Sequence, residues 1–506
     1  MNVVNKNIVA NILGRGWSIV STFIFIPIYI SILGVKMYGV VSFYAVLQGV
    51  LIFADAGLTA SLKRELAKGN DSIESRKRKY KIFRSIETVY LLIVLLIGIF
   101  IFVGADYIVQ KWLNIQDLEV LATRQGIQIM GFALALNFLS RLYQGGILGL
   151  EKQVHSNVLQ ISWGVLKNVG VILALIAIDK TLNVFFIWNL SINLIYVLVL
   201  RNFLFKTLKK SDGLLWKLFE DFKALKGIWR YASGMLIISI IAAINSQIDK
   251  IVLSKTLTVS ELAIYTVAYS LSTVPVVLSG PIATAIFPRL TRYYSQSDTL
   301  KLHKTFNNSF NLVLLVTSIA GLTLALYADF FIEIWTGNIE IAHNASLPAF
   351  YLLLAQILLS FQIIPFNLSL ARGNTRINIY VGLIGIIFLI PAMFYSAKTY
   401  GMVGVAVTSF IYFLISTPIY IGLVVTKFTN LQFFKWFLEN NLRPLVLIFA
   451  GSLIFYFINA QFVLSNLFKA IYILVSTALL FILGFRIMFN VNIKNTISFI
   501  KNELFA

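Results

Sequence analysis

The chain has 506 residues, of which 58% are hydrophobic, only 12% are charged and none is cysteine. Soluble domains carry roughly twice that share of charged residues, so the composition excludes an ordinary soluble protein, and the lack of cysteine excludes disulfides and thiol chemistry. The formal net charge of +21 is typical of lysines and arginines beside anionic lipid headgroups, and we predict no nucleic acid partner. The three histidines lack the spacing of metal ligands, so no metal site and no cofactor are expected.

Long apolar segments follow one another along the whole chain. Most have about 18 to 25 residues, the length that a helix needs to cross the hydrocarbon of a bilayer, and the alternating runs of a β-barrel are not seen. The sequence therefore predicts an all-α integral membrane protein with about fourteen transmembrane helices. The predicted spans are 8–33, 38–60, 85–104, 119–140, 157–178, 184–204, 231–254, 262–287, 307–327, 347–370, 378–397, 401–424, 444–460 and 467–488.

The positive charge alternates between successive loops. Of the 42 lysines and arginines, 32 lie in loops and termini on the side of the N-terminus, four lie within spans and six lie on the opposite side. Loops rich in Lys and Arg stay in the cytoplasm, so we predict a multi-pass protein of the bacterial inner membrane with both termini cytoplasmic. The six residues on the opposite side are Lys36, Lys111, Lys180, Lys255, Lys398 and Lys469.

The order of the spans is consistent with an internal duplication. Residues 34–38 join spans one and two, and residues 261–265 occupy the same place between spans seven and eight. Two six-span halves would share one orientation, although chance similarity between apolar segments is an alternative. The predicted organisation is an N-terminal lobe (1–210), a cytoplasmic amphipathic linker (211–230), a C-terminal lobe (231–426), and two extra spans with a cytoplasmic tail (427–506). Span eight contains three prolines and is either a bending helix or a static bend.

Three cations lie inside predicted spans of the first half. A charge near the bilayer centre costs about 2.5–3.5 kcal/mol, so such a group is expected to face protein or water. Arg15 continues a polar stripe with Asn11 in span one, Arg124 lies one turn from Gln128 in span four, and Lys167 lies near the middle of span five. We interpret the cations as lining a cavity, with Lys167 as the strongest candidate. Snorkelling to the surface for the arginines, and a structural role for the lysine, are the alternatives.

Two further spans contain carboxylates. Asp55 in span two either pairs with Arg15 or couples transport to an ion, and Asp249 with Lys250 in span seven forms either a coupling site or an ion pair at the interface. The first half thus holds more buried cations than anions, which favours an anionic cargo such as a phosphate or pyrophosphate. No nucleotide-binding, zinc-protease or serine-hydrolase motif is present, so we predict no enzyme and no catalytic residue. The remaining polar candidates for the cavity wall are Gln48, Asn245 and Gln356.

Several short motifs occur in a characteristic order. They are the Gly34–Gly39 turn, Asp55-Ala-Gly57-Leu followed by Lys63-Arg64, Gln247-Ile-Asp249-Lys250 with Glu261–Tyr265, Ile286-Phe-Pro288-Arg289-Leu, and Tyr400-Gly401-Met-Val-Gly404. In these motifs the chain resembles the polysaccharide-transport branch of the MOP exporter superfamily, which includes the Wzx-type O-antigen flippases. The resemblance implies two six-helix lobes around a central cavity. It relates Arg15, Arg124 and Lys167 to the family's cavity cations by location only.

The resemblance also implies a function. Members carry undecaprenyl-diphosphate-linked oligosaccharide repeat units to the periplasmic leaflet for O-antigen or other surface polysaccharides, by alternating access of the two lobes. Expected partners are this lipid-linked glycan, membrane lipids, and assembly proteins such as a polymerase or chain-length regulator. Alternatives are a multidrug and cation exporter, for which an acidic cavity and twelve spans are expected, and a peptidoglycan-precursor flippase. A membrane polysaccharide polymerase would need a large external loop with catalytic Arg or Asp, which is not evident.

Overall fold

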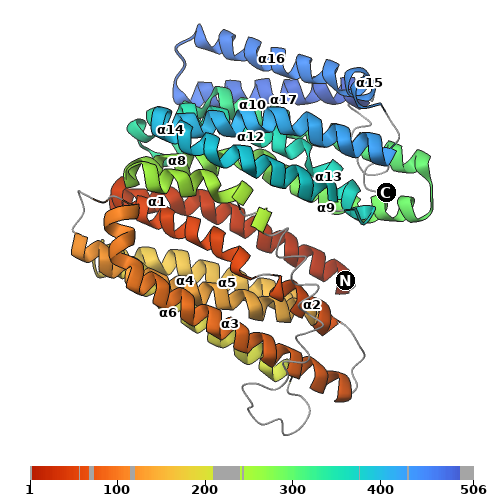
Figure 1. Ribbon diagram of the computed structural model, residues 1–506. Coiled ribbons are helices and arrows are strands. Elements are labelled where there is room, and N and C mark those ends of the chain that lie inside the picture. The colour runs from red at the N-terminus through yellow and green to blue at the C-terminus, as the bar shows by residue number, and fades with distance from the viewer. Residues whose placement is uncertain are drawn as a thin grey trace. The chain divides into compact units, whose positions relative to one another are not determined.

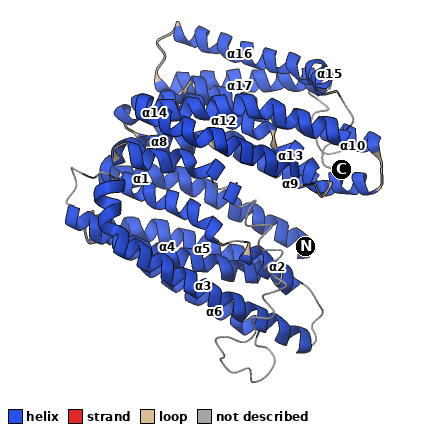
Figure 2. Cartoon of the chain, viewed as in Figure 1, coloured by secondary structure: helices blue, strands red, loops and turns tan. Residues whose placement is uncertain are grey.

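The computed structural model describes residues 3–55, 57–67, 73–113, 115, 120–208, 240–241, 244–374, 376–429 and 432–489. Every regular element in these ranges is a helix (Figure 2). The chain divides into two compact units, Met1–Ala263 (unit 1) and Ile264–Ala506 (unit 2), with the boundary inside one helix. The predicted linker 211–230, residues 231–239 and 242–243 of the predicted span 231–254, and the C-terminal tail beyond 489 lie outside the described residues.

Unit 1 is built from long helices (Figure 1). They are α1 (Val3–Ala54), α2 (Leu58–Ala67), α3 (Ile73–Tyr107) with the π-helical turn η1 (Ile108–Trp112), α4 (Val120–Gly149), α5 (Gln153–Ala177), α6 (Leu182–Leu208), helical residues 244–256, and the first residues of α8 (Val259–Ser272). Within the unit, α4 packs against α3 and α6, while α5 packs against α1 and α6.

Unit 2 is a second helical bundle. It contains α9 (Val274–Ser295), α10 (Thr299–Leu326), α11 (Ala328–Thr336), α12 (Ile339–Phe361), α13 (Ile363–Ala371), α14 (Arg376–Thr429), α15 (Phe433–Phe437), the π-helical turn η2 (Leu438–Leu442), α16 (Arg443–Ala460) and α17 (Asn466–Phe489). Helix α10 is its centre, because α9, α12, α16 and α17 all pack against it. Residues 331–346, which lie between two predicted spans, are largely helical, since α11 and the start of α12 occupy them.

The helices have the length and exposure of membrane spans. Ten helical stretches among the described residues are long and apolar enough to cross a bilayer. On α3, the side chains of Leu96, Phe100 and Val103 are 66%, 78% and 73% exposed, which water would not tolerate over a continuous surface. Lipid is the solvent that suits this surface, so the predicted all-α membrane fold is confirmed.

Two of these helices each contain two predicted spans. Helix α1 is interrupted at Gly34 (φ 78°, ψ 164°) and α14 at Gly401 (φ 59°, ψ −144°). Both values of φ lie in the region that only glycine adopts without strain, so each interruption coincides with the predicted boundary between spans. The count of about fourteen spans is consistent with this division. Helix α4 corresponds to the predicted span 119–140, and residues 244–256 overlap the predicted span 231–254.

Proline sets the other interruptions. Pro365 cannot donate the hydrogen bond of a continuous helix, and its ring clashes with the carbonyl four residues earlier. Helix α12 accordingly ends at Phe361, and α13 begins at Ile363. In the same way, Pro275 lies at the start of α9, directly after the end of α8. The predicted span 262–287 is therefore two helices joined at Thr273.

Candidate functional site

Lys167 of α5 lies inside unit 1 and is held by aromatic rings. Its Nζ is 5.1 Å from the ring centroid of Trp163, one turn earlier on the same helix, and 5.6 Å from that of Tyr44 on α1. No carboxylate among the described residues forms an ion pair with it. The next residue, Asn168, accepts a hydrogen bond of 2.9 Å from the Tyr29 hydroxyl, which joins α5 to α1. Ring faces stabilise the ammonium and leave its N–H donors available for an anion.

The aromatic wall beside Lys167 is fixed by a polar network from three helices. The Trp163 indole donates to Asn193 of α6 (3.1 Å), whose amide donates to the Ala133 carbonyl of α4 (2.9 Å). Trp163 also stacks on Tyr196 with ring centroids 5.0 Å apart, and the Tyr196 hydroxyl accepts a bond of 2.5 Å from Gln144. Because the Trp163 indole, the Asn193 amide and the Tyr196 hydroxyl all have partners, these two rings are held in place in the unit.

Asp55 lies at a helix break, not inside a span. Helix α1 ends at Ala54, and the Asp55 carboxylate accepts from the backbone N–H (3.0 Å) and the hydroxyl (2.7 Å) of Thr59 at the start of α2. Gly57 has a positive φ of 73°, which glycine adopts without strain. The Asp55-Ala-Gly57 motif therefore ends one helix and caps the next.

The same carboxylate also connects α2 to other helices. The Tyr90 hydroxyl of α3 donates to Asp55 and lies 2.7 Å from the Thr59 hydroxyl. The Arg141 guanidinium of α4 attracts the Asp55 carboxylate electrostatically. Asp55 thus has a structural role in the described residues. The side chains of Arg15 and Asn11 lie outside them, so the predicted Arg15–Asp55 pair stays a prediction, as does ion coupling by Asp55.

A buried charge cluster was missed by the sequence analysis. Glu87 of α3 is completely buried and accepts hydrogen bonds from Arg84, from Arg201 of α6 (2.9 Å) and from the Tyr143 hydroxyl of α4 (2.7 Å). Both guanidinium groups lie over the Phe205 ring, with centroid distances of 5.6 and 4.3 Å. The cluster binds α3, α4 and α6 together at one end of the unit.

Arg84 and Arg201 lie at the cytoplasmic edges of the predicted spans 85–104 and 184–204, and the sequence analysis counts both among the charges that mark the cytoplasmic side. The structure instead extends α3 back to Ile73, so that Arg84 lies on a packed helix and is only 2% exposed. One local signal was available, because Arg84 and Glu87 have the i, i+3 spacing at which opposite charges meet on a helix. The partners on α4 and α6 are distant in sequence and could not be inferred.

Arg124 and Gln128 lie near the surface of unit 1. Arg124 forms an ion pair of 3.0 Å with Asp106, and both side chains are nearly half exposed, at 41% and 49%. The Gln128 side chain is 3.5 Å from the Phe102 carbonyl of α3. A partner and solvent access together allow Arg124 to remain charged without a cargo. Its role as a cavity cation therefore stays a prediction with a competing structural explanation.

The other predicted residues are placed as follows. Asp249 and Lys250 are both buried, 3.7 Å apart, and the Lys250 ammonium is 3.3 Å from the Ser246 carbonyl. Asn245 donates to the carbonyl of Ile241 at 2.9 Å. In addition, Gln48 is half-buried on the second half of α1, and Gln356 is buried in α12 of unit 2. Lys167, Gln48 and the Asp249–Lys250 pair thus all belong to unit 1.

The helical fold, its lipid-facing surface and the buried charges of unit 1 define a multi-pass membrane protein. Residues 4–294, more than half of the chain, match the family described as polysaccharide biosynthesis protein. The chain belongs to this family. It is also 21% identical over 388 residues to a Shigella flexneri protein named "Putative O-antigen transporter", a match that covers 74% of this chain and 87% of that protein.

Solved structures with the same fold include a lipid II flippase and a multidrug transporter of the MOP superfamily. The lipid II flippase MurJ, in an inward closed conformation, matches with a TM-score of 0.72 and 14% identity, over 96% of this chain and 98% of that chain. An inward-facing multidrug resistance transporter of the MATE family matches with a TM-score of 0.66 and 14% identity, over 82% and 94% of the two chains. At this identity the likeness shows the fold alone, and it agrees with the predicted fold.

Proposed function

We propose that the protein is a flippase that carries undecaprenyl-diphosphate-linked oligosaccharide repeat units across the inner membrane for O-antigen or another surface polysaccharide. The family and the name of the Shigella flexneri relative support transport of a polysaccharide precursor. The observation that carries the cargo assignment is Lys167. It is a cation inside a membrane bundle, and no carboxylate in the described part of the chain neutralises it.

The chemistry of the cargo explains why such a residue is useful. A diphosphate carries its charge on oxygens that accept charge-assisted hydrogen bonds, and the Lys167 ammonium supplies donors where water is scarce. The sugar hydroxyls cannot enter hydrocarbon without partners, so they require a polar path, while the polyprenyl tail remains in lipid. Arg15 and Arg124 are further candidates for this path. Alternating access of two six-span lobes, with both termini in the cytoplasm, completes the proposal.

A proton or sodium gradient would drive the cycle through a buried ionisable group. Asp249 and Lys250 are the candidates in the described residues, because both side chains are buried and only 3.7 Å apart. Replacing Asp249 with Asn, which keeps the size and removes the charge, is expected to abolish dependence of transport on the ion gradient. Normal gradient dependence in this variant would leave the pair with a structural role.

A peptidoglycan-precursor flippase is the second candidate, because the MurJ fold covers nearly the whole chain. Lipid II also carries a diphosphate, so Lys167 does not separate the two. Deletion of the gene separates the two functions. Loss of one surface glycan with normal growth supports our proposal, whereas lysis supports the peptidoglycan function. A multidrug exporter is disfavoured, since a cationic drug would be repelled by an unpaired ammonium.

The test of Lys167 is complementation of a deletion strain. We expect Lys167→Gln to reduce surface polymer strongly at normal protein abundance, and to leave lipid-linked repeat units on the cytoplasmic leaflet. Lys167→Arg should retain part of the activity because it keeps the charge. Lys180→Gln, which removes an exposed loop cation, is the matched control and should behave as wild type. Wild-type polymer with Lys167→Gln would remove this residue from the mechanism.

A further inference from the structure

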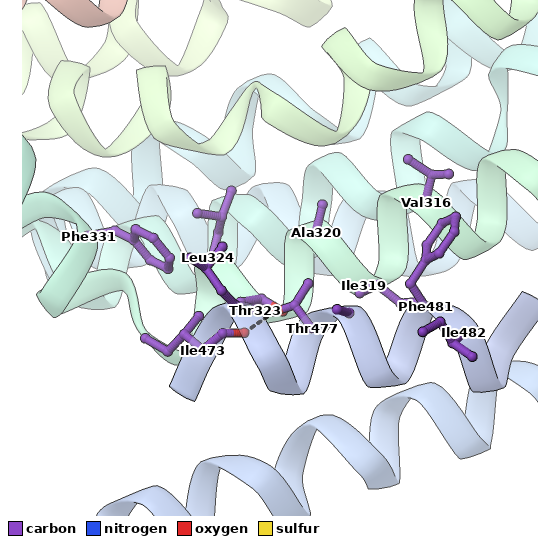
Figure 3. Close-up of a pocket in the computed structure, with 12 residues that line it drawn as sticks. Val316, Ile319, Ala320, Thr323, Leu324, Phe331, Ile473, Thr477, Phe481 and Ile482 are labelled. Atoms are coloured by element: carbon purple, nitrogen blue, oxygen red, sulfur yellow. Dashed lines mark hydrogen bonds between the residues drawn. The ribbon is translucent and has the colours of Figure 1, made fainter. Parts of the chain in front are cut away.

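An apolar groove of about 570 Å³ runs along unit 2 between α10 and α17 (Figure 3). Its volume is in the range of about 300–1,000 Å³ that small-molecule sites occupy. On the floor, the hydroxyls of Thr323 and Thr477 lie 3.3 Å apart, and Thr477 also donates to the Ile473 carbonyl at 2.6 Å. Because these hydroxyls are paired with each other and with the backbone, the groove presents carbon to its occupant.

The groove extends over about one leaflet of a bilayer. Ile473 marks one end and Phe481 and Ile482 the other, which is about 13 Å along a helix axis. Half of the hydrocarbon core is about 15 Å thick. Helix α10 ends and α17 begins beside the Ile473 end, so this end lies toward the membrane surface that the charge pattern assigns to the periplasm.

A cation lies at this end of the groove. Lys469 precedes Ile473 by one turn of α17, and its Nζ is 4.7 Å from the ring centroid of Phe330. Phe330 is the neighbour of Phe331, which lines the groove. No carboxylate in the described ranges pairs with Lys469. It is also one of only six basic residues on the side of the membrane that is otherwise poor in positive charge.

We propose that the groove binds one acyl chain of an anionic phospholipid, with its phosphate on Lys469. Lipid tails are as apolar as the groove, so no hydrophobic force drives a tail into it. The selection among lipids must then come from the headgroup, and a cation at the mouth favours an anionic one. Phosphatidylglycerol is the occupant that combines both features. The proposal requires only a membrane-spanning protein, and it is independent of the cargo proposed above.

The test uses two lipids that differ only in the headgroup. Phosphatidylglycerol and phosphatidylcholine, each with the same diazirine-bearing acyl chain, are incorporated into vesicles with the full-length protein, and labelled residues are mapped by mass spectrometry. We expect labels on α10 and α17 within the groove, with about fivefold more from phosphatidylglycerol, the preference that one cation near a phosphate supplies. Lys469→Gln should lower phosphatidylglycerol labelling to the phosphatidylcholine level, whereas Lys398→Gln, at an exposed lysine of the same side, should not.

A second variant tests the groove itself. Ala478 is exposed and lines the groove, so Ala478→Phe fills it without overpacking a core and should remove both labels while the protein stays monodisperse. Equal labelling by the two lipids in the wild type would overturn the proposal. So would displacement of the label by an equal fraction of undecaprenyl phosphate, which would assign the groove to a polyprenyl chain. Because the chain has no cysteine, Leu474→Cys can report a second copy, and its crosslinking in place of lipid labelling would also overturn the proposal.

Discussion

Replacing Glu87 with leucine should destabilise unit 1 more than the loss of any single exposed charge. The carboxylate is fully buried, and the side chain of Arg84 beside it is only 3% exposed, whereas that of Arg201 is 29% exposed. Removing one partner of a buried pair costs about 3–5 kcal/mol, because the other charge is left without compensation. Arg201 can recover part of this by turning to solvent, so Arg84 accounts for most of the loss.

The same structure predicts a rescue. Arg84→Met leaves Glu87 with Arg201 and Tyr143 as partners, and should cost only about 1–2 kcal/mol. In the double variant Glu87→Leu/Arg84→Met no fully buried charge remains, and apolar replacement of a buried pair is often neutral. We therefore expect the double variant to be more stable than Glu87→Leu alone.

Thermal unfolding of the purified protein in detergent measures this order, with loss of the monodisperse fraction as the readout at a fixed heating rate. Glu340→Leu, which removes an exposed carboxylate of α12, is the control and should melt as the wild type does. A Glu87→Leu protein as stable as the wild type would refute the reasoning. A double variant no more stable than Glu87→Leu would refute the assignment of the cost to the uncompensated arginine.

Two more changes follow from local geometry. A Cβ at Gly145 would lie 2.3 Å from Thr59, so Gly145→Leu should separate α2 from α4 and lower the melting temperature, whereas Gly104→Ala, with nothing within 4 Å, should not. Asp298 caps α10, and the hydrogen bond from the Lys301 backbone N–H lowers the pKa of its carboxyl. A lowered folded-state pKa stabilises the protein fully above the unfolded value of about 3.9, and this stabilisation is lost as the pH falls from that value through the lower folded-state pKa. The melting-temperature difference between wild type and Asp298→Asn should therefore shrink below about pH 4. A difference that is constant with pH would contradict this role.

The breaks between helices could be predicted where one residue determines the backbone. Gly34 and Gly401 interrupt their helices because a positive φ requires glycine, and the sequence places span boundaries at both. The position of Lys167 within a helix of unit 1 could also be predicted, because the residues around it in sequence are apolar or neutral. In these cases the decisive information lies within a few residues of the chain.

Other features depended on residues that are far apart in sequence. Asp55 was assigned to a span because the apolar segment continues to residue 60, but its carboxylate caps α2 and accepts from Tyr90, 35 residues later. Glu87 meets Arg201 across 114 residues. A hydropathy pattern places charges along the chain, but it cannot show which helices pack against one another. It distinguishes a loop charge from a buried charge only where the predicted helix boundaries are correct.

The two units differ in the kind of polar group that they bury, and this has a consequence for movement. In the described part of the chain, the buried charged side chains all belong to unit 1: Arg84, Glu87, Asp249 and Lys250. Unit 2 buries neutral groups instead, and its helices are broken before Pro275 and Pro365. Separating neutral groups costs less than separating buried charges, and helix breaks are the places where bending concentrates.

Local opening should therefore occur more readily at the breaks of unit 2 than in α3 and α4 of unit 1. Amide hydrogen exchange of the protein in nanodiscs measures this directly. We expect faster exchange at the start of α9 and of α13 than in residues of α3 and α4 at similar distances from the membrane surface. Equal protection of the two sets would show that buried charge does not stiffen unit 1. Slower exchange at the proline breaks would show that they are static bends, which is the alternative that the sequence left open for span eight.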